Sequence, residues 1–167
     1  MRSVRASNGC RPVSEDARFE DAGGAPLRLR AFDTDDLQVI SALVQDAVLP
    51  ASEMRWSRKD RRFALLLNRF RWEESAAQKQ AERVQSVLSI EDVTAVKVQG
   101  LSQHDPDLVV SILAISFEPS TDGAGRVLLT LAGDGAIACE VEALEVMLRD
   151  VTRPYGAPSG KTPAHLY

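Results

Sequence analysis

The side chains best suited to chemistry gather in one stretch, residues 55–72. Seven of its residues are Lys or Arg and one, Asp60, is acidic, although the chain as a whole has a formal net charge of -4. Guanidinium groups bind phosphate and carboxylate oxygens, and an aromatic ring beside them can stack on a base. The stretch therefore predicts a surface that binds RNA or an acidic protein. Its candidate binding residues are Arg55, Arg58, Lys59, Arg61, Arg62, Arg69, Arg71 and Trp72.

The same residues have a simpler interpretation. Charges on an edge hairpin keep it soluble and discourage pairing with other chains, while Trp56 and Trp72, the two Trp residues of the chain, can belong to the core. The cations could also pair with the acidic start of a predicted helix. Because surface charges are usually only solvated, binding is a hypothesis that depends on where these side chains lie.

Enzymatic chemistry has little support in the sequence. The two histidines are His104, before a turn signal, and His165, close to residue 167. His104 next to Asp105 could act as a polarised base, so an enzyme of unrecognised type using His104 and nearby carboxylates is the alternative to binding. A catalytic base needs a pocket and a partner, and the sequence has no phosphate-binding glycine loop or Cys/His metal spacing. We therefore predict no catalytic residue, cofactor or metal.

Length and composition indicate one cytoplasmic globular domain. The chain has 167 residues, of which 44% are hydrophobic and 26% charged, values that are ordinary for such a domain. No apolar run approaches the ~18 residues that span a bilayer, and no apolar segment follows Arg2 and Arg5 as in a signal peptide. Cys10 and Cys139 are expected to be free thiols in a reducing compartment.

The folded domain is expected to span residues 27–153. Residues 1–26 lack an apolar periodicity, and residues 154–167 contain three Pro and two Gly. Neither segment can bury enough apolar surface to offset its ordering entropy, so both are predicted to be tails, the first of them disordered. Val13 is a candidate first residue, because GTG codons can start translation in bacteria; residues 1–12 would then be an artefact of start-site assignment.

The basic stretch is predicted to form a hairpin, with a turn at residues 57–61 and Phe63 facing the core. Arg69 and Arg71 fall on the Phe63 face by alternation, which predicts either a bulge or a strand that runs past the core. Residues 108–117 predict a central strand buried on much of both faces. Asp134-Gly135 predicts a type I′ turn between two further strands, residues 126–132 and 136–141.

Two helices are expected to accompany the sheet. Asp33, Asp35 and Asp36 begin a helix over residues 35–48 that Pro50 ends; these carboxylates could hold a metal, but capping explains them more simply. Glu142 to about Val151 predicts a closing helix with an apolar stripe. The fold class is therefore α+β, a bent and mostly antiparallel sheet of about seven strands with an early and a C-terminal helix. By analogy, this suggests a pleckstrin-homology-like barrel.

Three segments resemble one family of bacterial proteins. They are residues 31–47, beginning Ala31-Phe32-Asp33, residues 61–72, beginning Arg61-Arg62-Phe63-Ala64-Leu65, and residues 125–153. The family is mainly alphaproteobacterial and is known only as a domain of unknown function. The resemblance covers about residues 17–163 and implies a small cytoplasmic bacterial protein. Since the family has no assigned catalytic residues, the resemblance transfers no site residue to this sequence.

Overall fold

The computed structural model describes residues 26–71, 82–102, 105, 107–152 and 155–156. This part of the chain holds one α-helix, α1 (Thr34–Val44), one 3-10 helix, η3 (Ala51–Glu53), and eleven strands. The strands are β2 (Arg28–Ala31), β3 (Val48–Pro50), β4 (Met54–Ser57), β5 (Arg62–Phe70), β6 (Glu82–Ile90), β7 (Val93–Gln99), β8 (Val109–Pro119), β9 (Gly125–Leu131), β10 (Ala136–Val141), β11 (Val146–Asp150) and β12 (Tyr155–Gly156). Residues 1–25 and 157–167, most of the two predicted tails, lie outside it.

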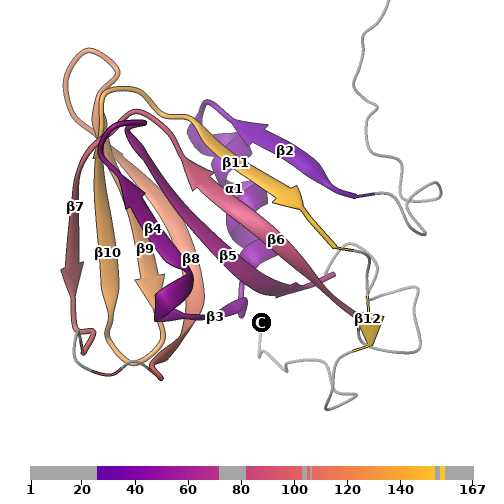
Figure 1. The fold of residues 1–167 in the computed structure, drawn as a ribbon. Coiled ribbons are helices and arrows are strands. Elements are labelled where there is room, and N and C mark those ends of the chain that lie inside the picture. The colour runs from indigo at the N-terminus through magenta and orange to yellow at the C-terminus, as the bar shows by residue number, and fades with distance from the viewer. Residues whose placement is uncertain (1–25, 72–81, 103–104, 106, 153–154, 157–167) are drawn as a thin grey trace, which may run out of the picture.

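The strands form one bent antiparallel sheet (Figure 1). Its order is β2-β11-β6-β5-β3-β8-β9-β10-β7, with β4 also pairing with β5 and β12 with β6. The short strand β3 joins the two halves of the sheet, because Val48 lies opposite both Asn68 of β5 and Ser111 of β8. Helix α1 packs mainly on β8 and also contacts β2 and β5. The fold is thus α+β with an antiparallel sheet, as predicted, but it has more strands than the expected seven.

The predicted C-terminal helix is wrong, because residues 146–150 form strand β11. Leu148 lies between Leu29 of β2 and Leu88 of β6. The residue types of this segment favour a helix locally. However, its buried side chains, Val146, Leu148 and Asp150, alternate with more exposed ones, and pairing on both edges gives it a full set of strand hydrogen bonds. The analogy with a pleckstrin-homology-like barrel depended on a closing helix, and β11 stands in the place of that helix.

The first helix is capped as predicted. Oδ1 of Asp33 accepts a hydrogen bond from the backbone N–H of Asp36 at 2.8 Å, and this bond satisfies one of the free amides of the first turn. The helix is shorter than predicted and ends at Val44. Pro50 is not what ends it: Asp46 has a φ of 65°, which is incompatible with a continuing right-handed helix.

Two details of the strands also differ from prediction. Strand β8 is buried on one face only, with Val109 and Leu113 exposed at 60% and 42%. The predicted hairpin of β9 and β10 is confirmed. Its positive φ angles, however, belong to Gly133 (79°) and Asp134 (69°), so the centre of the turn lies one residue earlier than Asp134-Gly135.

Cys139 is a free, fully buried thiol on β10. Burial, helped by the charge of Glu140, raises the pKa of this thiol to about 12. Because the thiolate is the reactive form, we expect Cys139 in a folded Cys10→Ser variant to react with Ellman's reagent at pH 8 at least about 1,000-fold more slowly than in urea, where a cysteine has its ordinary pKa. Similar rates in the folded and unfolded protein would contradict this burial.

Candidate functional site

The structure divides the predicted binding residues into separate groups. Five exposed cations lie on β4, on the following turn and at the start of β5: Arg55, Arg58, Lys59, Arg61 and Arg62. Two others, Arg69 and Arg71, are buried at the opposite end of β5, with exposed fractions of 0% and 3%. Trp72 lies outside the described residues. The predicted surface is therefore confined to one end of the hairpin.

Arg69 belongs to a buried polar network rather than to a surface. Its Nη2 donates to both carboxylate oxygens of Asp150, at 3.0 and 3.1 Å, and its Nε donates to Ser86 Oγ at 3.1 Å. The Ser86 hydroxyl in turn donates to Asp150 Oδ1 at 2.7 Å. The pairing of β5 with β6 runs from Phe63 to Phe70 without a register shift. The predicted bulge is therefore wrong, and Arg69 faces the interior because a carboxylate meets it there.

Arg71 also makes structural contacts. Its Nη1 donates to Glu82 Oε1 at 2.7 Å, and its backbone N–H donates to the carbonyl of Glu82 at 3.1 Å. These bonds join Arg71, the residue that follows β5, to Glu82, the first residue of β6. Arg69 and Arg71 are thus corrected from candidate binding residues to parts of the framework.

Residues 57–61 form the hairpin tip, and side-chain hydrogen bonds fix its shape. Ser57 Oγ donates to Asp60 Oδ2 at 3.0 Å and accepts the backbone N–H of Asp60 at 3.3 Å. The turn closes at Arg61, which has a φ of 54°. The charged side chains of the tip are consequently presented by a defined turn on a paired hairpin.

The exposed cations differ in whether a carboxylate neutralises them. Nε of Arg62 donates to both carboxylate oxygens of Glu91 at 3.0 Å. Arg61 forms an ion pair with Glu142, whose hydrogen bond and charge raise the pKa of Arg61. Within the described ranges, no carboxylate pairs with Arg55, Arg58 or Lys59. These last three cations carry the available positive charge of the hairpin.

A groove of about 590 Å³ opens beside the hairpin tip, and we call it the tip groove. It is lined by Trp56, Arg58, Arg61, Glu142 and residues 93–96 of β7. The groove begins where β7 leaves the hairpin, since the N–H of Val93 donates to the carbonyl of Arg61 at 2.9 Å. Trp56 packs partly against the core, which fixes that wall of the groove.

Strand β7 presents an open edge at this groove. It is the last strand in the sheet order and pairs with β10 on its other edge. Beyond Val93, the strand has no backbone hydrogen bond to a third strand among the residues that the structure places. Such an edge offers alternating N–H and C=O groups to an additional strand.

Sequence reasoning missed three exposed arginines on the outer face of the sheet, Arg28 and Arg30 of β2 and Arg149 of β11. A signal for the first two was present, because the alternation over residues 27–30 points both arginines to the same face. Arg149 had no such signal, because its segment was predicted as a helix. Only the pairing of β2 with β11 brings the three together.

The enzyme alternative has no geometry to support it, because His104 lies outside the described residues. Asp105 accepts the N–H of Asp107 on Oδ1 at 2.9 Å, as a turn residue does. In the described part of the chain, no three His, Cys, Asp or Glu residues are gathered as metal ligands would be. No helix in that part combines the length and apolar character that crossing a membrane requires.

Comparison with known proteins confirms the family resemblance and adds no activity. Residues 27–165 match one family model, DUF2948, which is described as a protein of unknown function. No curated protein and no solved structure matches the chain.

Proposed function

We propose that this chain, which belongs to the DUF2948 family of unknown function, is a non-enzymatic module that binds an extended acidic segment of a partner protein. The segment would occupy the tip groove. The observation that carries the proposal is the open edge of β7 beside Arg58, a groove cation that no described carboxylate neutralises. A cytoplasmic location stays a prediction.

The open edge of β7 favours a polypeptide over RNA, the other partner that the basic hairpin suggests. In strand addition, a peptide pairs its main-chain N–H and C=O groups with an exposed strand edge, and pockets beside the edge select its side chains. RNA has no repeating amide groups at strand spacing. An exposed edge is normally blocked, because it invites unwanted pairing, so an accessible one beside a groove supports a role in binding.

The charges at the groove favour an acidic segment. Arg58 lines the groove, Lys59 follows it at the exposed hairpin tip, and Arg55 lies on β4 outside the lining, whereas Arg61 and Glu142 neutralise each other. Local positive charge on a chain with a formal net charge of -4 steers acidic partners to this end. Trp56 adds an aromatic wall against which an apolar side chain of the segment can pack.

We expect the charge reversal Arg58→Glu with Lys59→Glu to abolish binding of a labelled ten-residue peptide of alternating Glu and Val, measured by fluorescence anisotropy at low salt. Both side chains are exposed, so the free energy of unfolding should change by no more than about 0.5 kcal/mol. The matched control is Arg28→Glu with Arg149→Glu, which changes the net charge equally at a different place. Equal weakening in both variants would contradict a site at the tip groove.

Two further measurements test the kind of partner. A peptide N-methylated at every second residue keeps its charges but loses the donors of one edge, so strand addition predicts at least about tenfold weaker binding. A twelve-nucleotide single-stranded RNA is the competing probe. If the RNA binds and the peptide does not, the assignment to a protein partner is overturned; if neither binds at low salt, the cations are only solvated.

A further inference from the structure

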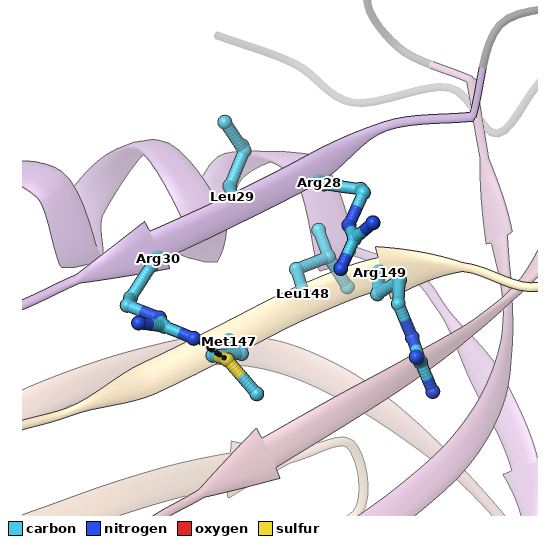
Figure 2. Close-up of a pocket in the computed structure, with 6 residues that line it drawn as sticks. All are labelled: Arg28, Leu29, Arg30, Met147, Leu148 and Arg149. Carbon is cyan, nitrogen blue, oxygen red and sulfur yellow. Dashed lines mark hydrogen bonds between the residues drawn. The ribbon is translucent and has the colours of Figure 1, made fainter. Parts of the chain in front are cut away.

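A second group of arginines lies on the outer face of β2 and β11 (Figure 2). Arg28 and Arg30 of β2 lie opposite Arg149 and Met147 of β11. A cavity of about 190 Å³ is lined by these four residues together with Leu29 and Leu148. None of these residues lines the tip groove, so the two places are separate.

Arg28 and Arg149 are directly opposite each other across the two strands. Like charges in this position, with Cβ atoms about 4.5–5.5 Å apart, destabilise a sheet. Within the described part of the chain, neither arginine has a carboxylate partner. Figure 2 shows the side chain of Arg149 extending away from Arg28. The pair is thus an unfavourable arrangement that no carboxylate of the described residues compensates.

Arg30, the neighbouring arginine on β2, differs from Arg28 and Arg149 because a carboxylate lies beside it. Nε of Arg30 lies 3.6 Å from Glu145 Oε2, and its Nη2 donates to the sulfur of Met147 at 3.0 Å. The guanidinium carbon of Arg30 also lies 5.9 Å from the centre of the Phe32 ring. Arg30 therefore forms a wall of the cavity, while Arg28 and Arg149 supply its available charge.

The two strands cannot separate easily to relieve the repulsion. The N–H of Asp150 donates to the carbonyl of Leu27 at 2.9 Å, and the N–H of Leu27 donates to Asp150 Oδ2 at 2.9 Å. The same carboxylate holds Arg69 in the interior. These bonds fix the residues adjacent to Arg28 and Arg149, so a ligand would meet a pair whose backbone is already ordered.

We propose that Arg28 and Arg149 form a binding site for a phosphate group that accepts hydrogen bonds from both guanidinium groups. The exposed side chain of Arg149 would turn back toward Arg28 when the phosphate binds, which relieves the repulsion between the two charges. A phosphate monoester carries nearly two negative charges and three acceptor oxygens at neutral pH, so one group can neutralise both arginines. The cavity is smaller than the roughly 300–1,000 Å³ of sites that enclose a whole small molecule. The rest of a phosphorylated ligand would lie outside, and the nearby aromatic ring it could reach past Arg30 is that of Phe32, which is exposed at 60%.

The site is tested by titrating inorganic phosphate into the full chain at pH 7.5 and constant ionic strength, with calorimetry and with NMR of the arginine Nε–H signals. We expect saturable shifts at Arg28 and Arg149. The variant Arg28→Gln with Arg149→Gln should bind phosphate at least about tenfold more weakly. Without phosphate it should melt at the same or a higher temperature, because the repulsion is gone.

The control variant is Arg55→Gln with Lys97→Gln, which removes two exposed cations elsewhere and should keep the phosphate affinity. Ribose 5-phosphate and AMP distinguish the source of the phosphate. Tighter binding of AMP that Phe32→Ala removes would assign a nucleotide, and equal affinities would assign the phosphate group alone. A phosphate response that persists in the Arg28→Gln/Arg149→Gln variant, or that chloride reproduces at equal ionic strength, overturns the site.

Discussion

Replacement of Asp150 by Asn is expected to lower the free energy of unfolding by about 3–5 kcal/mol, the usual effect of breaking a buried ion pair from one side. The Arg69 side chain is fully buried and that of Asp150 is 4% exposed. Asn keeps the size of the side chain, so the loss reports the charge and its hydrogen bonds rather than a cavity. Urea unfolding followed by tryptophan fluorescence measures the difference.

A double variant separates the charge from the remaining hydrogen bonds. Arg69→Met with Asp150→Leu removes both ions, and apolar replacements of a buried pair are often neutral or stabilising. Here the double variant should regain only part of the lost free energy of unfolding, because Asp150 also accepts the N–H of Leu27 and the hydroxyl of Ser86. Each buried donor left without an acceptor costs about 1–3 kcal/mol. A loss below about 1 kcal/mol for Asp150→Asn alone would mean that water reaches Arg69 in the folded protein.

The parts of the fold that sequence predicted correctly depend on residues close together in the chain. The cap of α1 joins Asp33 to Asp36, and the two hairpins have a turn signal between alternating strands. Alternation also placed Phe63 on the inner face, where it is buried. In such cases the pattern and the tertiary contacts favour the same structure.

The parts that failed depend on distant partners. The segment of β11 fits both a helical stripe and a strand alternation, which share Leu148, and pairing with β2 and β6 decides between them. Arg69 was expected to leave the core, because a lone charge is expensive to bury. Its counter-charge Asp150 is 81 residues away in the sequence, where no local pattern can reveal it.

The candidate sites follow the same distinction. The basic hairpin was predicted from a local run of cations. Five of these cations are exposed, and they lie on β4, on the turn and at the start of β5. The pair of Arg28 and Arg149 exists only through strand pairing across the whole domain, so composition and periodicity could not indicate it. The open edge of β7 could not be predicted from the sequence either. Whether a strand lies at an edge depends on how all the other strands pair in the folded domain.

Replacement of Phe63 by Ala is the other change with a large expected effect, a loss of about 3–5 kcal/mol in the free energy of unfolding. Phe63 is 4% exposed and lies opposite Trp56 of β4 and Ile90 of β6. Its removal leaves a cavity between strands that are held by pairing on both sides, so the site cannot collapse fully. Thermal and urea unfolding should both detect the loss.

The adjacent Arg62→Gln variant is the matched control, since it alters the same strand on its outer face. The Arg62 side chain is half exposed in its ion pair with Glu91, whose own side chain is 14% exposed, so we expect a loss of about 1 kcal/mol. A Phe63→Ala protein as stable as wild type would contradict the burial of Phe63 on the inner face of the hairpin.

Phe63 also separates framework from binding at the tip groove. It supports Trp56 from the neighbouring strand position but has no part in the lining of the groove. Peptide binding by Phe63→Ala should therefore fall in proportion to the fraction of folded protein, whereas binding by Arg58→Glu with Lys59→Glu should fall while the protein stays folded. If both variants lost binding only as they lost structure, the cations of the hairpin tip would be part of the framework, as Arg69 and Arg71 are.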